Sequence, residues 1–186
     1  MRQTDSRYNK NMTTYVLAGG CFWCLDAVYR RLNGVEEVTS GYTGGDIPYP
    51  SYEQVSLGTS GHAEAVRVRF DESVIPAETI LDLFFLIHDP TTLDRQGNDV
   101  GPQYRSALFY ASDEERQAFE AACDRAKEHW GETIVTQIAP LDEFYIAEEY
   151  HQDYFNKNPA AGYCSIIIAP KISKARAAFK KWFKED

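Results

Sequence analysis

Apolar and polar positions follow two different periods along the chain, and together they predict a mixed order of strands and helices. Apolar runs and period-two alternation predict strands at about 15–20, 35–38, 64–70, 106–110, 134–139 and 165–168. Apolar residues at helical spacing predict helices at about 21–32, 77–88, from 113 onward, and 171–184. Because strands that alternate with helices imply βαβ units, we expect an α/β or an α+β sandwich.

Two long polar segments, Gly41–Gly61 and Asp89–Tyr104, interrupt this pattern and are predicted to be loops. Loops of this length in a compact domain are more often functional than decorative. Ser112 and Glu115 are spaced as a capping box for the helix that begins near Asp113.

The composition limits the classes of protein that the chain can belong to. With 186 residues, 44% of them hydrophobic, the chain is long enough to bury one core. A net charge of −9 disfavours a nucleic-acid surface. No apolar run reaches the roughly 20 residues of a membrane span. We expect residues 1–12 to form a disordered arm without a secretory signal, and residues 13–186 to form a single domain of a cytoplasmic monomer.

The segment Gly19-Gly-Cys-Phe-Trp-Cys24 joins the first predicted strand to the first helix. Cys21 is therefore expected at a helix N-terminus, where the helix dipole favours an anion and lowers the pKa of a thiol. Cys21 and Cys24 form a C-x-x-C pair on one helix face. This spacing fits a nucleophile with a resolving neighbour, half of a zinc site, or two small buried residues. Zinc is the weaker functional interpretation because no second C-x-x-C occurs and the four histidines lack paired spacing.

Glu64 is the carboxylate with the most specific pattern. Period two places it on the same face as Val66, Val68 and Phe70. A carboxyl on an apolar face loses hydration, and this raises its pKa and lets it act as a general acid. The alternative interpretation is a solvated residue at the first position of a strand.

Several other side chains could line a site. Phe22 and Trp23 follow the thiol and could form an apolar wall or ordinary core. Hydrogen bonds to a polar substrate atom could come from loop residues that could equally be half-buried anchors: Tyr42, Tyr49, Tyr52, Asp99 and Tyr104.

The remaining histidines and cysteines have simpler interpretations. His62 and His151 are expected to form local caps, and Cys123 falls on a helix stripe and is expected to fill the core. Cys164 could be an exposed second thiol or a buried strand residue.

These segments resemble the A-type peptide methionine sulfoxide reductases, and the match runs from about Tyr15 to Cys164. The segments that carry the resemblance are Gly20-Cys-Phe-Trp-Cys24, Ser40-Gly-Tyr-Thr-Gly-Gly45, Tyr52, Thr59-Ser-Gly-His-Ala-Glu64, His88-Asp-Pro90, Arg95-Gln-Gly-Asn-Asp99, Gln103-Tyr-Arg-Ser106, Tyr150-His-Gln-Asp153, Asn158-Pro159 and Gly162-Tyr-Cys164.

The resemblance implies an α+β two-layer sandwich with a ferredoxin-like βαβ core and long wrapping loops. It implies that Cys21 attacks the sulfur of a methionine S-sulfoxide, free or within proteins, while Glu64 protonates its oxygen with help from Tyr52 and Tyr104. Phe22 and Trp23 would hold the methyl group and Asp99 would lie near the substrate backbone.

Turnover would leave Cys21 as a sulfenic acid, then form an intramolecular disulfide that thioredoxin reduces, with no cofactor and no metal. Either Cys164, slightly favoured by its Gly-Tyr-Cys context, or Cys24 would be the resolving thiol. Asp26 departs from the family, which often has Glu at this place. The competing hypotheses are a non-catalytic thiol sensor or metal module, and a general dithiol oxidoreductase.

Overall fold

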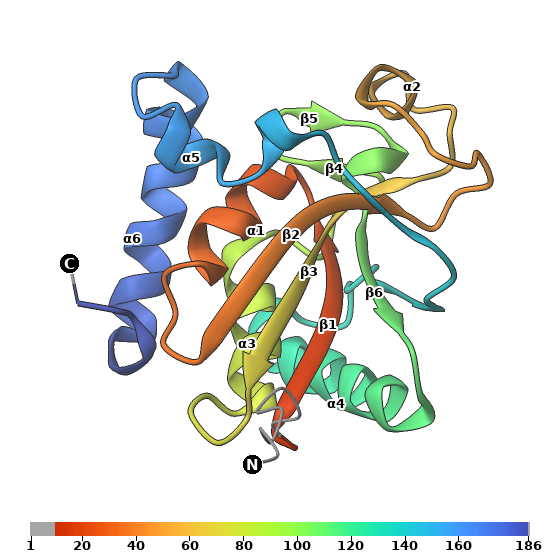
Figure 1. Ribbon diagram of the computed structural model, residues 1–186. Coiled ribbons are helices and arrows are strands. Elements are labelled where there is room, and N and C mark those ends of the chain that lie inside the picture. Colours follow the sequence, from red (N-terminus) through yellow and green to blue (C-terminus); the bar gives the residue numbers. More distant parts are fainter. Residues whose placement is uncertain (1–9, 186) are drawn as a thin grey trace, which may run out of the picture.

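The computed structural model describes residues 10–185 and contains a six-stranded sheet in the order β7-β6-β1-β3-β2-β8 (Figure 1). Its strands are β1 (Met12–Gly19), β2 (Val35–Thr43), β3 (Ala63–Asp71), β6 (Ser106–Tyr110), β7 (Gln137–Pro140) and β8 (Phe144–Ile146). The helices are α1 (Phe22–Tyr29), α2 (Tyr52–Ser56), α3 (Ala77–Ile87), α4 (Asp113–Trp130), α5 (Tyr154–Lys157) and α6 (Ala169–Ala178). A separate hairpin joins β4 (Arg95–Gln96) to β5 (Asp99–Val100).

The strand directions bring chain segments from four places to one end of the sheet. β1 pairs antiparallel with both β3 and β6, and β2 also pairs antiparallel with β3. β1 and β2 therefore finish at the same end of the sheet at which β3 and β6 begin. β7 runs parallel to β6, so the sheet is mixed.

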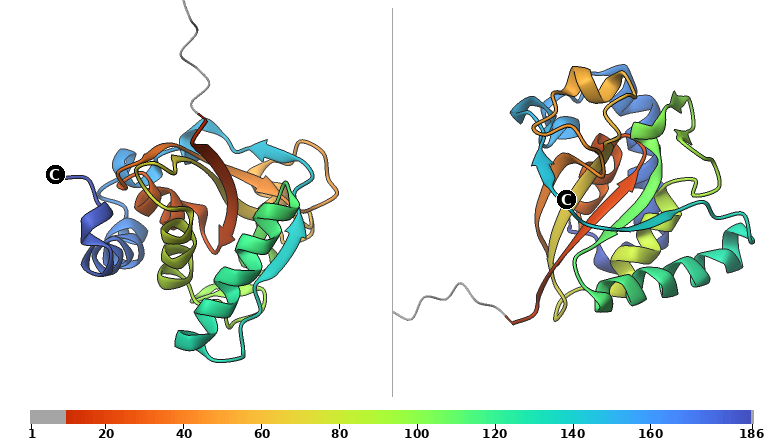
Figure 2. Two further views of the ribbon diagram at one scale, coloured as in Figure 1. Left: turned by 90° about the horizontal axis from the view of Figure 1, so that it is seen from below. Right: turned by 90° about the vertical axis from the view of Figure 1, so that its right-hand side faces the viewer.

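Helices α1, α3 and α4 lie on one face of the curved sheet (Figure 2). The alternation predicted for β3 is confirmed, because Val66, Val68 and Phe70 belong to the main core whereas Arg67 and Arg69 are partly exposed. The opposite face is also covered near the centre of the sheet, by a smaller cluster of Val16, Ala18, Ala63, Ala65, Ala107 and Phe109.

Helix α4 confirms the predicted N-terminus. The Ser112 hydroxyl accepts the Glu115 N–H, while the Glu115 carboxylate accepts the N–H of Ala111. Phe119 and Ala122 are buried on its inner face. Within residues 10–185, no helix has both the length and the apolar character needed to cross a membrane.

The predicted strand at 165–168 is wrong. Cys164–Ile168 is a π-helical turn that continues into α6. Cys164, Ile168 and Ile172 are buried at intervals of four, whereas Ile166 is 71% exposed. The run of three isoleucines therefore has a helical burial pattern.

Other boundaries also differ from the prediction. β2 extends through Thr43 into the first predicted loop, and this loop also contains α2. The last helix ends at Ala178 and is followed by a 3₁₀ turn at Lys180–Trp182. Residues 1–9 of the expected arm lie outside the described residues, and Met12 opens β1, paired with Asp71.

Candidate active site

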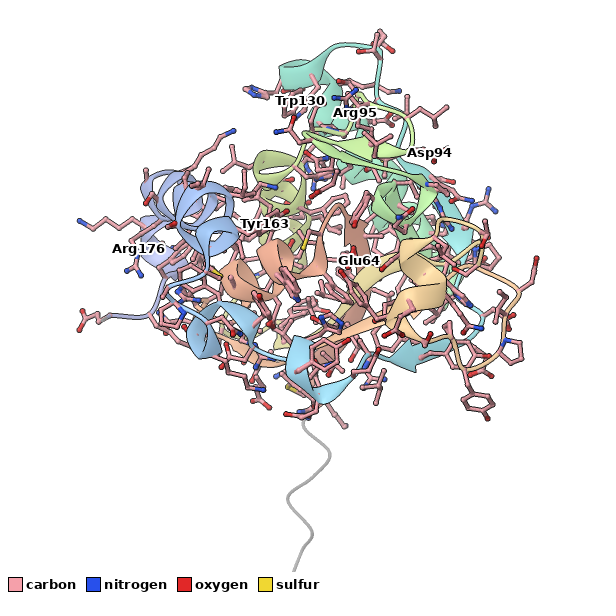
Figure 3. All side chains as sticks on the ribbon, turned by 90° about the horizontal axis from the view of Figure 1, so that it is seen from above. Glu64, Asp94, Arg95, Trp130, Tyr163 and Arg176 are labelled. Carbon is pink, nitrogen blue, oxygen red and sulfur yellow. The ribbon has the colours of Figure 1, made fainter. Side chains whose placement is uncertain are left out.

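The end of the sheet at which β1 and β2 finish carries the residues that the sequence singles out. Cys21 follows β1 by two residues, Glu64 is the second residue of β3, and Tyr104 lies two residues before β6. Figure 3 looks onto this end of the sheet, with Glu64 near the middle of the view and Tyr163 on the side of α6. Residues far apart in the sequence are therefore adjacent because of the strand order.

Cys21 is the N-cap residue of α1 and is 7% exposed. Gly20 before it has φ +93°, a conformation that L side chains rarely adopt, and a Cβ there would lie 2.5 Å from the Gln96 side chain. The Cys24 N–H donates to the Cys21 carbonyl at 3.1 Å and starts the helix. Both sulfurs are buried on the first turn, as the C-x-x-C spacing predicts.

The two thiols titrate as a coupled pair, and this changes the predicted electrostatics. Burial raises the pKa of Cys21 well above its ordinary value, and donation of its S–H to Cys24 raises it further. The same hydrogen bond lowers the pKa of Cys24 to about 7, with a smaller contribution from Lys171. The prediction of a lowered pKa for Cys21 is therefore wrong for the resting protein, because desolvation outweighs the helix terminus.

Glu64 is 3% exposed and lies opposite Tyr42 in the β2–β3 pair. Among the described residues its Oε2 has no hydrogen-bond partner. Burial raises the carboxyl pKa well above its ordinary value, and Asp99 adds to the effect. An ionised Glu64 would raise the pKa of Cys21 further, so the two groups interact electrostatically. These observations support a carboxyl that favours its protonated form, at the same end of the sheet as the Cys21 thiol.

Tyr52 and Tyr104 are half-buried beside this pair. Burial raises both phenol pKa values, and Glu64 is the largest charged contributor to each. Both phenols therefore remain hydrogen-bond donors. The Asp99 carboxylate accepts a hydrogen bond from the Tyr163 hydroxyl at 2.8 Å. Tyr49, another candidate donor from the sequence, is 86% exposed.

Phe22 and Trp23 differ in access. Phe22 is fully buried against Tyr42 and His151, whereas Trp23 is only partly buried. The Trp23 indole stacks on Tyr154 with ring centroids 3.6 Å apart, and its Nε1–H donates to Nδ1 of His151 at 3.1 Å. Trp23 can therefore present a fixed apolar surface to a bound group.

The segment from Glu148 to Tyr163 supplies residues that the sequence interpretation missed. The Glu148 carboxylate accepts the Tyr42 hydroxyl and the Tyr52 N–H, so it anchors the start of α2. His151 is not the predicted local cap, because its partner is 128 residues away. His62 instead braces the first loop, where its ring contacts the Gly45 N–H and the Ile47 carbonyl. The resemblance motifs Tyr150-His-Gln-Asp153 and Gly162-Tyr-Cys164 marked this segment in the sequence but did not assign these contacts.

The other two cysteines have different surroundings. Cys164 is fully buried and follows Tyr163, whose hydroxyl lies 4.0 Å from the Cys24 sulfur. Cys123 is only partly buried and packs against the main core, so it lies at the boundary of the core rather than filling it as predicted. In the range 10–185 no group of three or more His, Cys, Asp or Glu side chains could hold a metal ion.

A buried thiol pair at a helix start, with a buried carboxyl and two phenol donors at the same end of the sheet, is an arrangement typical of a thiol-dependent oxidoreductase. The model of the family "Peptide methionine sulfoxide reductase" matches residues 13–183. The chain belongs to this family, and it is an oxidoreductase that reduces methionine sulfoxide in peptides.

Known proteins agree with this assignment. The chain is 58% identical over 171 residues to the peptide methionine sulfoxide reductase MsrA of Pseudarthrobacter chlorophenolicus, covering 92% of this chain and 98% of that one. Its fold is similar to reduced Mxr1 from Saccharomyces cerevisiae, with a TM-score of 0.79, 38% identity, and coverage of 85% and 92% of the two chains. Mxr1 in complex with Trx2 also matches, with a TM-score of 0.57, 28% identity, and coverage of 81% and 91%.

The coupled titration of Cys21 and Cys24 gives a first prediction. Thiolate absorbance of the reduced protein should show a transition near pH 7, the pKa of Cys24. In Cys24→Ser this transition should disappear and Cys21 should ionise only well above pH 9, because it remains buried. Cys123→Ser, which alters a thiol on α4, is the matched control and should retain the transition. A transition near pH 7 that persists in Cys24→Ser would contradict its assignment to Cys24.

Proposed function

We propose that Cys21 attacks the sulfur of a methionine S-sulfoxide while Glu64 donates a proton to the departing oxygen. The observation that supports this most is the buried Glu64 carboxyl, unpartnered among the described residues and electrostatically linked to Cys21. Cys21 is protonated at rest, so its proton passes to the Cys24 thiolate with which it is hydrogen-bonded. The protonated oxygen passes from the substrate sulfur to the Cys21 sulfur as the S–O bond of the substrate breaks, so methionine leaves as the thioether and Cys21 becomes a sulfenic acid.

The surrounding side chains have separate roles in this proposal. Tyr52 and Tyr104 donate hydrogen bonds to the sulfoxide oxygen, and Trp23 packs against the substrate methyl group, backed by the buried Phe22 ring. Asp99, fixed by Tyr163, accepts from the substrate backbone. A general dithiol oxidoreductase would need only the cysteine pair and would leave the buried acid without a role.

Both candidate resolving cysteines have a place in the reaction. Cys24 is already hydrogen-bonded to Cys21, so its thiol condenses with the sulfenic acid and releases water. Cys164 directly follows Tyr163, whose hydroxyl lies 4.0 Å from the Cys24 sulfur, and Cys24 contributes to the raised pKa of Cys164. The Cys164 thiol then attacks the Cys24 sulfur, which frees Cys21 and leaves a Cys24–Cys164 disulfide. A thioredoxin dithiol reduces this disulfide, a step supported by the Mxr1–Trx2 complex.

The remaining expectations stay part of the proposal. The order β6-β1-β3-β2 with its α1 and α3 crossovers supports a ferredoxin-like core in a single domain from residue 13. We further propose substrates that are free or within proteins, repair under oxidative stress, a monomer, and a cytoplasm that keeps the four free cysteines reduced.

Replacement of the proposed acid gives a second prediction. Glu64→Gln should lower the single-turnover rate of sulfoxide reduction on the order of 10²-fold, with a smaller effect on binding. Because only the protonated acid works, the wild-type rate should fall as pH rises through the raised pKa of Glu64. This limb should be absent in Glu64→Gln. Glu36→Gln, on the exposed end of β2, should behave as the wild type. An unchanged rate in Glu64→Gln would reject the acid role.

The order of disulfide formation gives a third prediction. After one equivalent of a methionine sulfoxide peptide, mass mapping should find Cys24–Cys164 in the wild type and a trapped Cys21–Cys24 bond in Cys164→Ser. Cys24→Ser should accumulate the Cys21 sulfenic acid, detectable with dimedone. A Cys21–Cys164 bond that forms in Cys24→Ser at the wild-type rate would show instead that Cys164 resolves directly.

A further inference from the structure

His151 lies at the end of the 3₁₀ turn Glu149–His151, fully buried among aromatic rings. Its ring centroid is 4.4 Å from that of Tyr52 and 5.0 Å from that of Phe22. These contacts place it behind two side chains of the proposed site. The proposed reaction gives it no step.

The hydrogen bond to Trp23 determines which tautomer His151 adopts. An indole N–H can only donate, so Nδ1 of His151 must be an unprotonated acceptor. A neutral imidazole with a bare Nδ1 carries its proton on Nε2. Nε2 is buried and has no hydrogen-bond partner within residues 10–185. A buried donor without a partner costs free energy. The His151 ring nevertheless keeps this orientation, in which Nδ1 accepts the hydrogen bond from Trp23.

We propose that His151 is a positioning residue that fixes the Trp23 indole through its unprotonated Nδ1 and thereby shapes the pocket for the substrate methyl group. Stacking on Tyr154 sets the plane of the indole but contributes no directional contact within that plane. The hydrogen bond adds this contact because it holds the Nε1 edge of the ring against His151. The part of the proposal that concerns substrate rests on the role proposed for Trp23.

The surroundings of His151 keep it neutral. Burial lowers its pKa, and Glu148 and Glu53 oppose this effect only in part. Tyr52 and Tyr150 pack on the ring, and the Glu148 carboxylate is engaged by the Tyr42 hydroxyl. Protonation at acidic pH would turn Nδ1 into a second donor facing the indole donor, and the bond would break.

Two substitutions separate the two ring nitrogens. In His151→Asn the amide oxygen can stand where Nδ1 stands and can still accept from Trp23. In His151→Gln the longer side chain reaches the Nε2 position and leaves the indole unpaired. We expect KM for a methionine sulfoxide peptide to rise about tenfold in His151→Gln with a smaller change in kcat. His151→Asn should restore most of the loss. Equal losses in both variants would overturn the proposal.

Fluorescence provides a readout that needs no turnover. The chain has three tryptophans, so Trp130→Phe and Trp182→Phe leave Trp23 as the sole indole. Acidification should change Trp23 emission as His151 protonates, and His151→Asn should lack this transition because an amide does not titrate. The same transition in His151→Asn would overturn the hydrogen-bond assignment. A different outcome is that Trp23 emission changes only when His151 is present, while KM is unaltered in His151→Gln. This outcome would overturn the role of Trp23 in substrate binding and leave sulfoxide reduction itself intact.

Discussion

Removal of water from the Glu64 carboxyl is the constraint on which the rest of the site depends. An ionised carboxylate moved into a protein interior loses several kcal/mol of hydration unless a partner restores it, and the group then stays protonated instead. Alternation along β3 places Glu64 on the same face as Val66, Val68 and Phe70, which the helices cover. In the proposed reaction, this burial keeps on Glu64 the proton that the substrate oxygen receives.

The same burial sets the state of the thiols. A helix N-terminus favours an anion by about 0.3–1 kcal/mol, which is less than the desolvation of a buried thiolate. Cys21 consequently holds its proton, and the Cys24 thiolate is stabilised by the hydrogen bond that it accepts from the Cys21 thiol. In the proposed reaction, Glu64 supplies the acid and Cys24 the base for attack by Cys21. The proposed reactivity of Cys21 therefore depends on these two groups rather than on the helix dipole alone.

The chemistry of this site was more predictable than the structure that holds it. Period two was enough to place Glu64 on the core face, and β6 matches its predicted bounds at Ser106–Tyr110. The His151–Trp23 bond joins residues 128 positions apart, and no local period encodes it. The three consecutive isoleucines fit a strand as well as a helix, and only their packing decides. The raised pKa of Cys21 likewise depends on burial, which a motif does not reveal.

The most direct test of this account is the protonation state of Glu64 in the resting protein. Infrared difference spectroscopy of wild type against Glu64→Gln reports the carbonyl stretch of a protonated carboxyl. The account predicts that this band is present at pH 7 and is lost only at higher pH, as the raised pKa of a buried acid requires. A carboxylate that is already ionised at pH 7 would contradict it.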